Sequence, residues 1–200
     1  MVSQKALPRK FYEQRPLVVT KKLLGKNIVR RVEGGVMIAR IVETEAYIGP
    51  RDKASHAYDN RKTKRTLVQW SKRGCAYVFK IYGRNHCFCV VIGRRHVPAV
   101  ALIRAVEPLQ GLELMAKNRH VRSTVNLTNG PSKLAQALRI TSELNATDLC
   151  RRGDLFIAEG EEPIGRIVSS ARIGIDYARE YRSVPWRFCV PDSIFVSKRQ

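Results

Sequence analysis

Two glutamates stand two residues apart at the end of an apolar segment. Glu43 and Glu45 lie within Ile41–Tyr47, where β-branched residues are typical of a strand. Residues i and i+2 of a strand share one face, so these two carboxylates should perturb each other's ionisation. The pair is therefore either an exposed strand end with two solvated acids or a site in which one glutamate acts as a general base.

Arg104 is a lone charge within the apolar run Val100–Val106. A buried guanidinium is costly unless a carboxylate or a ligand neutralises it, so Arg104 is expected to have an acidic partner. Two explanations remain open. One is a structural ion pair with Glu107 or another acid, and the other is a place in an active site opposite a glutamate.

A third candidate is an aromatic residue beside a turn. Tyr77 and Phe79 should share one face of a strand over Ala76–Tyr82, and Tyr82 adjoins a turn that contains Arg84. Tyr82 either packs under this turn or projects from the hairpin tip. In the second case it could insert between stacked bases of a nucleic acid.

The chain is strongly basic, with 37 Lys and Arg against 17 Asp and Glu and a net charge of +20. This balance predicts a polyanionic partner, either nucleic acid or an anionic membrane surface. Basic clusters occur at 61–65, 94–95, 119–122 and 151–152. The stretch Asn129–Lys133 adds a possible anion site at the start of a helix.

Several classes of protein are disfavoured. The apolar runs are far shorter than the ~20 residues that span a bilayer. The first residues lack the apolar centre of a secretory signal, so an intracellular location is expected, in the cytoplasm and nucleoid or, in a eukaryote, the nucleus. Five irregularly spaced cysteines indicate reduced, mostly buried thiols, and the histidines and cysteines match no zinc pattern. No metal and no cofactor are predicted.

The length of 200 residues suits one domain over 1–200. Turn signals at Gly34-Gly35 and at 83–85 each join two strand-like runs, which predicts an α+β fold with a mostly antiparallel sheet and flanking helices. Residues 49–75 are expected to form a long basic loop. The expected helices cover 17–24, 109–119 and 131–138, and the expected strands cover 27–32, 36–44, 76–82, 87–92, 99–106, 154–158, 168–173 and 186–190.

Six segments, taken in order, resemble the alkyladenine (3-methyladenine) DNA glycosylase family of the mammalian type. They are IVETEAYIGPRDKASHAYDNRKTKRT, AYVFKIYGRNHCFCVV, ALIRAVEPLQGLELM, NGPSKLAQAL, and ARIGI followed by PWRF, and the resemblance runs from about Phe11 to Val196. It implies a single domain with a curved antiparallel sheet. It also implies a monofunctional glycosylase that flips alkylated or deaminated purines, such as 3-methyladenine, hypoxanthine and 7-methylguanine, out of duplex DNA and hydrolyses the N-glycosidic bond.

The resemblance also implies roles for individual residues. Glu45 matches the glutamate that activates water, and Arg104 and the main-chain carbonyl of Ile173 match the groups that hold this water. Tyr47, His56 and Phe79 match the residues that contact the flipped base, with Phe79 where a tyrosine often occurs. Tyr82 matches the side chain that fills the gap in the duplex. Cys89 replaces the usual asparagine that crowds the 2-amino group of guanine, so weaker exclusion of guanine lesions is expected.

The partner implied is double-stranded DNA containing damaged purines, bound by a monomer. Residues expected to contact the DNA backbone are Arg61, Lys62, Lys64, Arg65, Arg84, Ser132, Lys133 and Gly174. The alternative is a catalytically silent nucleic-acid-binding module of the same fold, which would have no need of Glu45 and Arg104 beside one pocket. A metal-dependent nuclease is disfavoured because no cluster of carboxylate or histidine ligands is evident.

Overall fold

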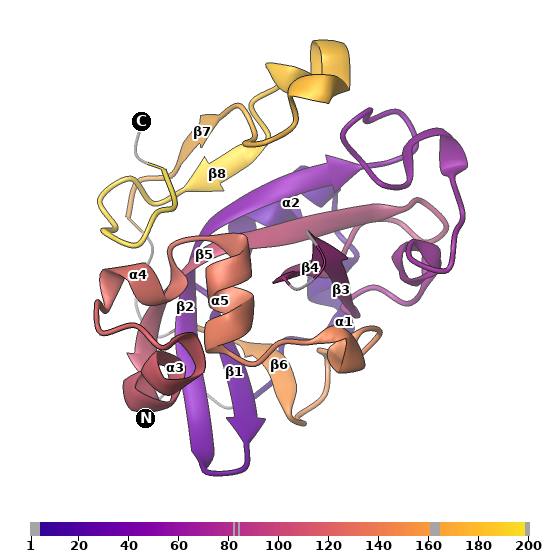
Figure 1. The fold of residues 1–200 in the computed structure, drawn as a ribbon. Coiled ribbons are helices and arrows are strands. Elements are labelled where there is room, and N and C mark those ends of the chain that lie inside the picture. The colour runs from indigo at the N-terminus through magenta and orange to yellow at the C-terminus, as the bar shows by residue number, and fades with distance from the viewer. Residues whose placement is uncertain (1–4, 82, 84, 161–164, 199–200) are drawn as a thin grey trace.

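Strands from both ends of the chain meet in one antiparallel sheet (Figure 1). The computed structural model describes residues 5–81, 83, 85–160 and 165–198. In this part of the chain the eight strands are β1 Asn27–Val32, β2 Gly35–Ile48, β3 Ala76–Ile81, β4 Asn85–Val91, β5 Ala99–Gln110, β6 Leu155–Ala158, β7 Val168–Ser170 and β8 Arg187–Cys189. Their order is β3-β4-β5-β2-β1-β6, and β8 pairs with both β2 and β7. Among the described strands, β3 and β6 are therefore the two edges of the main sheet.

Short helices cover the sheet. The α-helices are α1 Arg9–Tyr12, α2 Pro16–Lys22, α3 Leu112–Arg119, α4 Val125–Thr128 and α5 Pro131–Ala137. The 3-10 helices are η1 Tyr58–Asn60, η2 Leu67–Trp70, η3 Ser142–Leu144 and η4 Asp176–Arg182. In the view of Figure 1, α5 lies in front of β5 and β2, and α2 lies behind. Buried apolar side chains from α2, α3, α4, α5 and the central strands form the main core.

The central strand β2 carries both glutamates and changes its pairing near them. Its pairing with β5 steps from Ile41–Val106 to Glu43–Ala105 and then to Thr44–Ile103. Val42 of β2 and Arg104 of β5 are therefore the bulged residues, which have no partner in the β2–β5 register. Because a bulge redirects nearby side chains, the irregularity places Arg104 beside the two glutamates.

The α+β class, the antiparallel sheet and both predicted hairpins are confirmed. The prediction that a helix starts at Leu109 is wrong, because β5 continues to Gln110, whose partner is Ile38 on β2. Gly111, at φ +77°, then ends the strand. A Cβ atom on Gly111 would lie 2.7 Å from the carbonyl oxygen of Val36, which explains the glycine at this junction.

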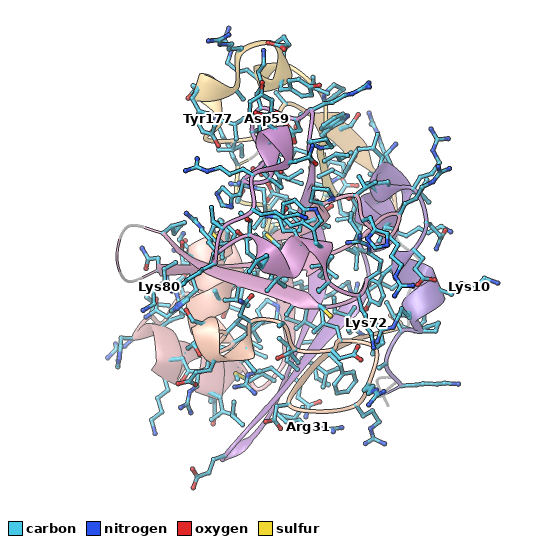
Figure 2. All side chains as sticks on the ribbon, turned by 90° about the vertical axis from the view of Figure 1, so that its right-hand side faces the viewer. Lys10, Arg31, Asp59, Lys72, Lys80 and Tyr177 are labelled. Atoms are coloured by element: carbon cyan, nitrogen blue, oxygen red, sulfur yellow. The ribbon has the colours of Figure 1, made fainter. Side chains whose placement is uncertain are left out.

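Two other predicted boundaries differ near the candidate site. β2 extends to Ile48 rather than ending at Thr44, so Glu45 and Tyr47 are strand residues. The predicted strand 168–173 is wrong in its second half, because β7 ends at Ser170. Residues 172 and 173 instead bind two buried carboxylates, Asp52 and Glu45. The loop 49–75 lies beside η4, as the neighbouring Asp59 and Tyr177 show in Figure 2. The Tyr177 hydroxyl donates to the carbonyl of Ala54 at 3.4 Å.

Candidate active site

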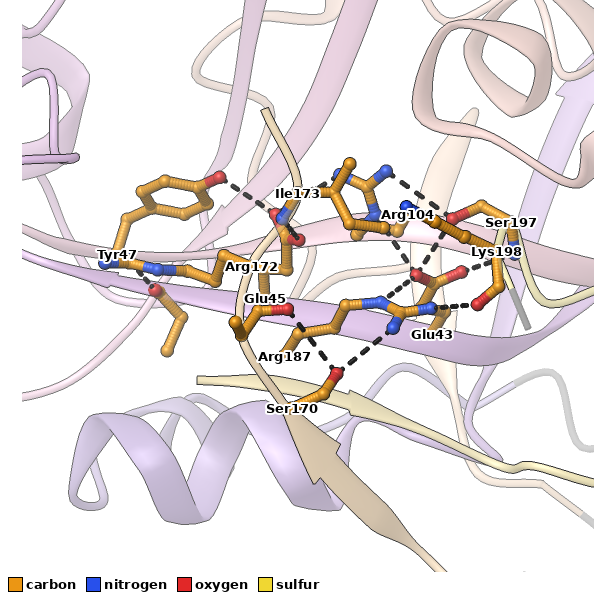
Figure 3. A network of polar contacts seen from close by, with 12 residues as sticks. Glu43, Glu45, Tyr47, Arg104, Ser170, Arg172, Ile173, Arg187, Ser197 and Lys198 are labelled. Atoms are coloured by element: carbon orange, nitrogen blue, oxygen red, sulfur yellow. Dashed lines mark hydrogen bonds and ion pairs between the residues drawn. The ribbon is translucent and has the colours of Figure 1, made fainter. Parts of the chain in front are cut away.

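Glu45 is a fully buried carboxylate with three donors around it (Figure 3). Its Oε2 accepts hydrogen bonds from the Tyr47 hydroxyl at 2.8 Å and from Nη1 of Arg104 at 3.3 Å. Its Oε1 accepts the main-chain N–H of Ile173 at 2.8 Å. The family resemblance implied a role for the carbonyl of Ile173, whereas the group that contacts Glu45 is the main-chain N–H. The carbonyl's role as a water ligand remains a prediction.

Arg104 joins the two glutamates of β2. Its Nε lies 3.2 Å from Oε1 of Glu43, and its Nη1 binds Glu45. Burial lowers the pKa of Arg104, but the charges of Glu45 and Glu43 outweigh this effect and raise the pKa above its usual value. The expected acidic partner is thus confirmed. The specific pairing with Glu107 is wrong, because Glu107 pairs with Arg40 at 3.7 Å.

Glu43 is also fully buried and binds a second arginine. Nε of Arg187, on β8, lies 2.6 Å from Oε1 of Glu43. The main-chain N–H and the hydroxyl of Ser197 donate to the same carboxylate at 2.7 and 2.9 Å. Two acids and two arginines therefore form one buried, charge-balanced group (Figure 3).

Arg172 and Asp52 form a second buried ion pair, with Nη1 and Nη2 of Arg172 at 2.6 and 2.8 Å from the two carboxylate oxygens. The guanidinium lies 4.7 Å from the centre of the Tyr47 ring and 5.1 Å from that of Trp186. Burial and the charge of Glu45 raise the pKa of the Tyr47 hydroxyl well above its usual value, which keeps the hydroxyl protonated as a donor.

A cavity of about 320 Å³ opens beside this group. Its wall contains all the described residues expected to contact the base, namely Tyr47, His56, Phe79 and Cys89, and it also contains Arg104, Ile173 and Gly174. Apolar side chains of β3, β4 and β5 form much of its floor. A mostly apolar cavity with a few convergent polar groups is typical of a site for a flat organic ligand.

Aromatic rings form one side of the cavity. The His56 ring lies edge-on to Phe79, with 4.8 Å between ring centres, and its Nδ1 is 3.0 Å from the Tyr77 hydroxyl. Burial and the charge of Arg65 lower the pKa of His56 to about 4, so this imidazole is neutral near pH 7. Burial raises the pKa of Tyr77 to about 12.

Three of the residues expected to contact phosphates line this cavity or the one beside it, and one of the three, Gly174, is in the wall already described. Arg61 and Arg65 line an adjoining cavity of about 360 Å³, to which His56 also contributes. The guanidinium of Arg65 stacks on Phe79 at 4.7 Å, and Lys62 lies 5.4 Å from the Trp70 ring centre. Lys64 is exposed.

The other phosphate-contact candidates are distributed as follows. Ser132 and Lys133 lie in the first turn of α5, where Lys133 donates to Oδ1 of Asn129 at 2.8 Å. The preceding Pro131 lines the base-sized cavity. Tyr82 and Arg84 lie outside the described residues, so their predicted roles remain predictions.

Arg172, Arg187, Ser197 and Tyr77 had no predicted site role, and neither had Gln69, which also lines the base-sized cavity. For the two arginines a signal exists, because each lies among apolar or aromatic residues in the segments ARIGI and PWRF. A buried charge with no neighbour of opposite sign in sequence predicts a distant partner. Ser197, Tyr77 and Gln69 carry no comparable signal.

Over residues 5–81, 83, 85–160 and 165–198, no group of three or more His, Cys, Asp or Glu side chains is arranged to hold a metal ion. The helices in the same ranges are each too short or too polar to cross a membrane. All five cysteines are free thiols, and four of them are buried, as predicted.

Comparisons with known proteins agree on one family. The model of the methylpurine-DNA glycosylase (MPG) family matches residues 10–194. A protein of Desulfitobacterium hafniense (strain Y51) named "Putative 3-methyladenine DNA glycosylase" is 46% identical over 201 residues, covering 96% of this chain and 98% of its own. Proteins with the same name from Clostridium tetani and Clostridium novyi are 46% and 43% identical, covering 96% and 98% of this chain and 99% and 100% of their own. These relatives are bacterial, so they support the family without the mammalian type.

Proposed function

The chain belongs to the methylpurine-DNA glycosylase family, and from this premise we propose that it excises alkylated or deaminated purines from duplex DNA. The observation that carries the proposal is the position of Glu45. This buried carboxylate is bound by Arg104, Tyr47 and Ile173, and all three of these residues line the aromatic cavity. A general base directly behind a base-sized pocket is what hydrolysis of a flipped nucleotide requires.

Binding in this proposal begins with extrusion of the damaged nucleotide, which costs least where the lesion weakens pairing. The purine then lies against the rings of Tyr47 and Phe79 and the edge of His56. Aromatic faces attract an electron-poor base, above all a cationic one such as 3-methyladenine. The neutral state of His56 near pH 7 adds no positive charge that would repel such a base.

Hydrolysis requires one water molecule and one general base. The N-glycosidic bond breaks with its electron pair going to the leaving purine, and the water oxygen bonds to C1′ of the sugar while Glu45 takes the water proton. A cationic purine such as 3-methyladenine then leaves as a neutral molecule, whereas a neutral one such as hypoxanthine must also take up a proton as it leaves. As an anion, Glu45 also stabilises the positive charge that develops on the sugar. We assign Arg104 and the carbonyl of Ile173 to holding the water.

Contacts with the DNA backbone are proposed for Arg61, Lys62, Lys64, Arg65, Arg84, Ser132, Lys133 and Gly174. Arg61 and Arg65 line the cavity next to the base pocket, where phosphates that flank a flipped nucleotide would pass. The net charge of +20 supports a binding affinity that falls steeply with salt. The protein is proposed to act as a single domain and a monomer on DNA inside the cell.

The test is single-turnover release of base from a duplex that carries one hypoxanthine or one 3-methyladenine. Parent protein and Glu45→Gln are compared, with binding to the same duplex measured in parallel and EDTA in excess. Excision by the parent that falls at least about 100-fold in Glu45→Gln while binding survives would support the proposal. Glu33→Gln, an exposed site on the β1–β2 turn, serves as the control and should excise at the parent rate.

Tight binding without excision by the parent would instead indicate a non-catalytic binding module. Activity that EDTA abolishes would indicate a metal-dependent enzyme, and the role given to Glu45 would then be wrong.

A further inference from the structure

Ser197, near the C-terminus, binds the carboxylate of Glu43, which lies beside the candidate general base Glu45. Ser197 donates to Glu43 through both its main-chain N–H, at 2.7 Å, and its hydroxyl, at 2.9 Å. Arg187 binds the same carboxylate at 2.6 Å and donates through Nη2 to the carbonyl of Lys198 at 2.6 Å. The contacts with Glu43 connect residues more than 140 positions apart in the sequence, and the Glu43 carboxylate is fully buried.

The same contacts determine how Arg104 is oriented. Each nitrogen of its guanidinium has an oxygen partner: Nε has Glu43 at 3.2 Å, Nη1 has Glu45 at 3.3 Å, and Nη2 has the Ser197 hydroxyl at 3.5 Å (Figure 3). A guanidinium is planar and rigid, so partners on Nε and Nη2 decide where Nη1 points. Here Nη1 points to Oε2 of Glu45.

We propose that Glu43, held by Arg187 and Ser197, is a positioning residue that directs Arg104 to Glu45, and that Ser197 and the carbonyl of Lys198 thereby support the active site. This inference rests on the proposed function. Glu43 also prevents a competing arrangement. Without it, Arg104 would be free to bind both oxygens of Glu45 as a bidentate pair, and it would then compete with the water for Oε1, which in the structure accepts the Ile173 N–H but no arginine.

Three variants test the proposal in single-turnover excision at saturating enzyme. Glu43→Gln keeps the side-chain shape but removes the charge, and its rate constant should fall about 10- to 100-fold with lesion-duplex affinity unchanged. Ser197→Ala removes the hydroxyl but keeps the main-chain contact, so a loss of a few-fold is expected. Ser197→Thr restores a hydroxyl and should recover most of the parent rate.

Ser193→Ala is the matched control in the same segment. The Ser193 hydroxyl accepts the N–H of Phe195 at 3.3 Å, and among the described residues the hydrogen-bond partners of Glu43 and Arg104 do not include it. Parent rates in both Glu43→Gln and Ser197→Ala would overturn the proposal. A loss that disappears at a temperature where every variant is fully folded would also overturn it, because it would reflect stability alone.

A measurement without catalysis separates this inference from the proposed function. The Nε–H resonance of Arg104 in ¹⁵N NMR spectra should be resolved and protected from exchange in the parent, and it should shift and lose protection in Ser197→Ala but not in Ser193→Ala. An unchanged resonance would overturn the positioning role even if the parent excises lesions. A changed resonance would support it even if the parent excises none.

Discussion

The guanidinium of Arg172 lies against the ring of Tyr47, 4.7 Å from its centre, while the hydroxyl of the same ring donates to Glu45 at 2.8 Å. Arg172 is itself fixed by Asp52 and by the carbonyl of Ala46, which accepts from Nη1 at 2.8 Å. The next residue, Ile173, presents its amide to Glu45. The Asp52–Arg172 pair therefore supports two of the three donors that surround the candidate general base.

Removing the charge of Asp52 should consequently destabilise the protein and disturb the site. Asp52→Asn leaves a buried arginine without a carboxylate, a change that typically costs about 3 kcal/mol or more of unfolding free energy. Urea unfolding monitored by circular dichroism measures this loss. Asp59→Asn, exposed in the same loop, should stay within about 0.5 kcal/mol of the parent. Equal stability of the two variants would show that the buried pair contributes little.

Much of the fold could be predicted because its signals are local. The Gly34-Gly35 turn joins two β-branched runs, and the structure has the corresponding hairpin between β1 and β2. The pairing of Arg104 with a glutamate could be expected for a related reason, since an apolar run that contains one arginine needs a buried acid. Which acid it would be depended on the register of β2 against β5, and the bulged pairing between these strands has no signal in the sequence.

Long-range contacts account for most of what could not be predicted. Arg187 and Ser197 reach Glu43 from 144 and 154 positions away, and Arg172 reaches Asp52 from 120 positions away. Residues 171–173 form an apolar run interrupted by one arginine, so a strand was a reasonable prediction there. The strand ends at Ser170 because Arg172 and Ile173 bind carboxylates instead of a neighbouring strand.

His56 should make the stability of the protein depend on pH. Its pKa is about 4 in the folded protein against 6.5 when unperturbed, because burial and Arg65 disfavour the charged form. Below pH 6.5 the unfolded chain gains a proton that the folded chain rejects, so stability falls as the pH drops from about 6.5 to about 4. The loss of unfolding free energy caused by His56 approaches roughly 3 kcal/mol at low pH, and there is no such loss above pH 7.

Unfolding free energies of the parent and His56→Gln at pH 7.5 and pH 4.5 measure this contribution by difference. The parent should lose more stability over this interval than His56→Gln does. His120→Gln removes an exposed histidine and should follow the parent. If all three proteins lose the same amount, His56 is not the residue responsible.

Tyr82 gives a prediction that rests on the sequence alone. If its side chain fills the gap left by a flipped nucleotide, Tyr82→Ala should slow excision in duplex DNA about 10-fold or more, because the cost of unstacking is then no longer offset. The same variant should excise from single strands at nearly the parent rate, since no stack has to be held open. Excision rates on matched duplex and single-stranded oligonucleotides decide the matter, and equal losses on both substrates would remove the wedge assignment.

Cys89 is expected to broaden the range of purines that the site accepts. It is 2% exposed, lines the cavity and lies opposite Tyr77 and Leu102 on the neighbouring strands. Burial raises the pKa of its thiol well above the usual value, so the group stays neutral and small. An asparagine here would extend further into the cavity and crowd a 2-amino group. Cys89→Asn should therefore slow the release of 7-methylguanine about 10-fold or more and leave 3-methyladenine, which has no 2-amino group, nearly unaffected.

The release of 7-methylguanine and 3-methyladenine can be measured on one methylated DNA substrate. The ratio of the two release rates does not depend on differences in protein concentration or stability. Cys87→Ser, on the same face of β4 and also in the cavity wall, is the matched control and should preserve the parent ratio because it adds no bulk. A ratio that is equal in the parent and in Cys89→Asn would mean that residue 89 does not contact the 2-amino position. Exclusion of guanine lesions would then have to arise from the other residues of the wall.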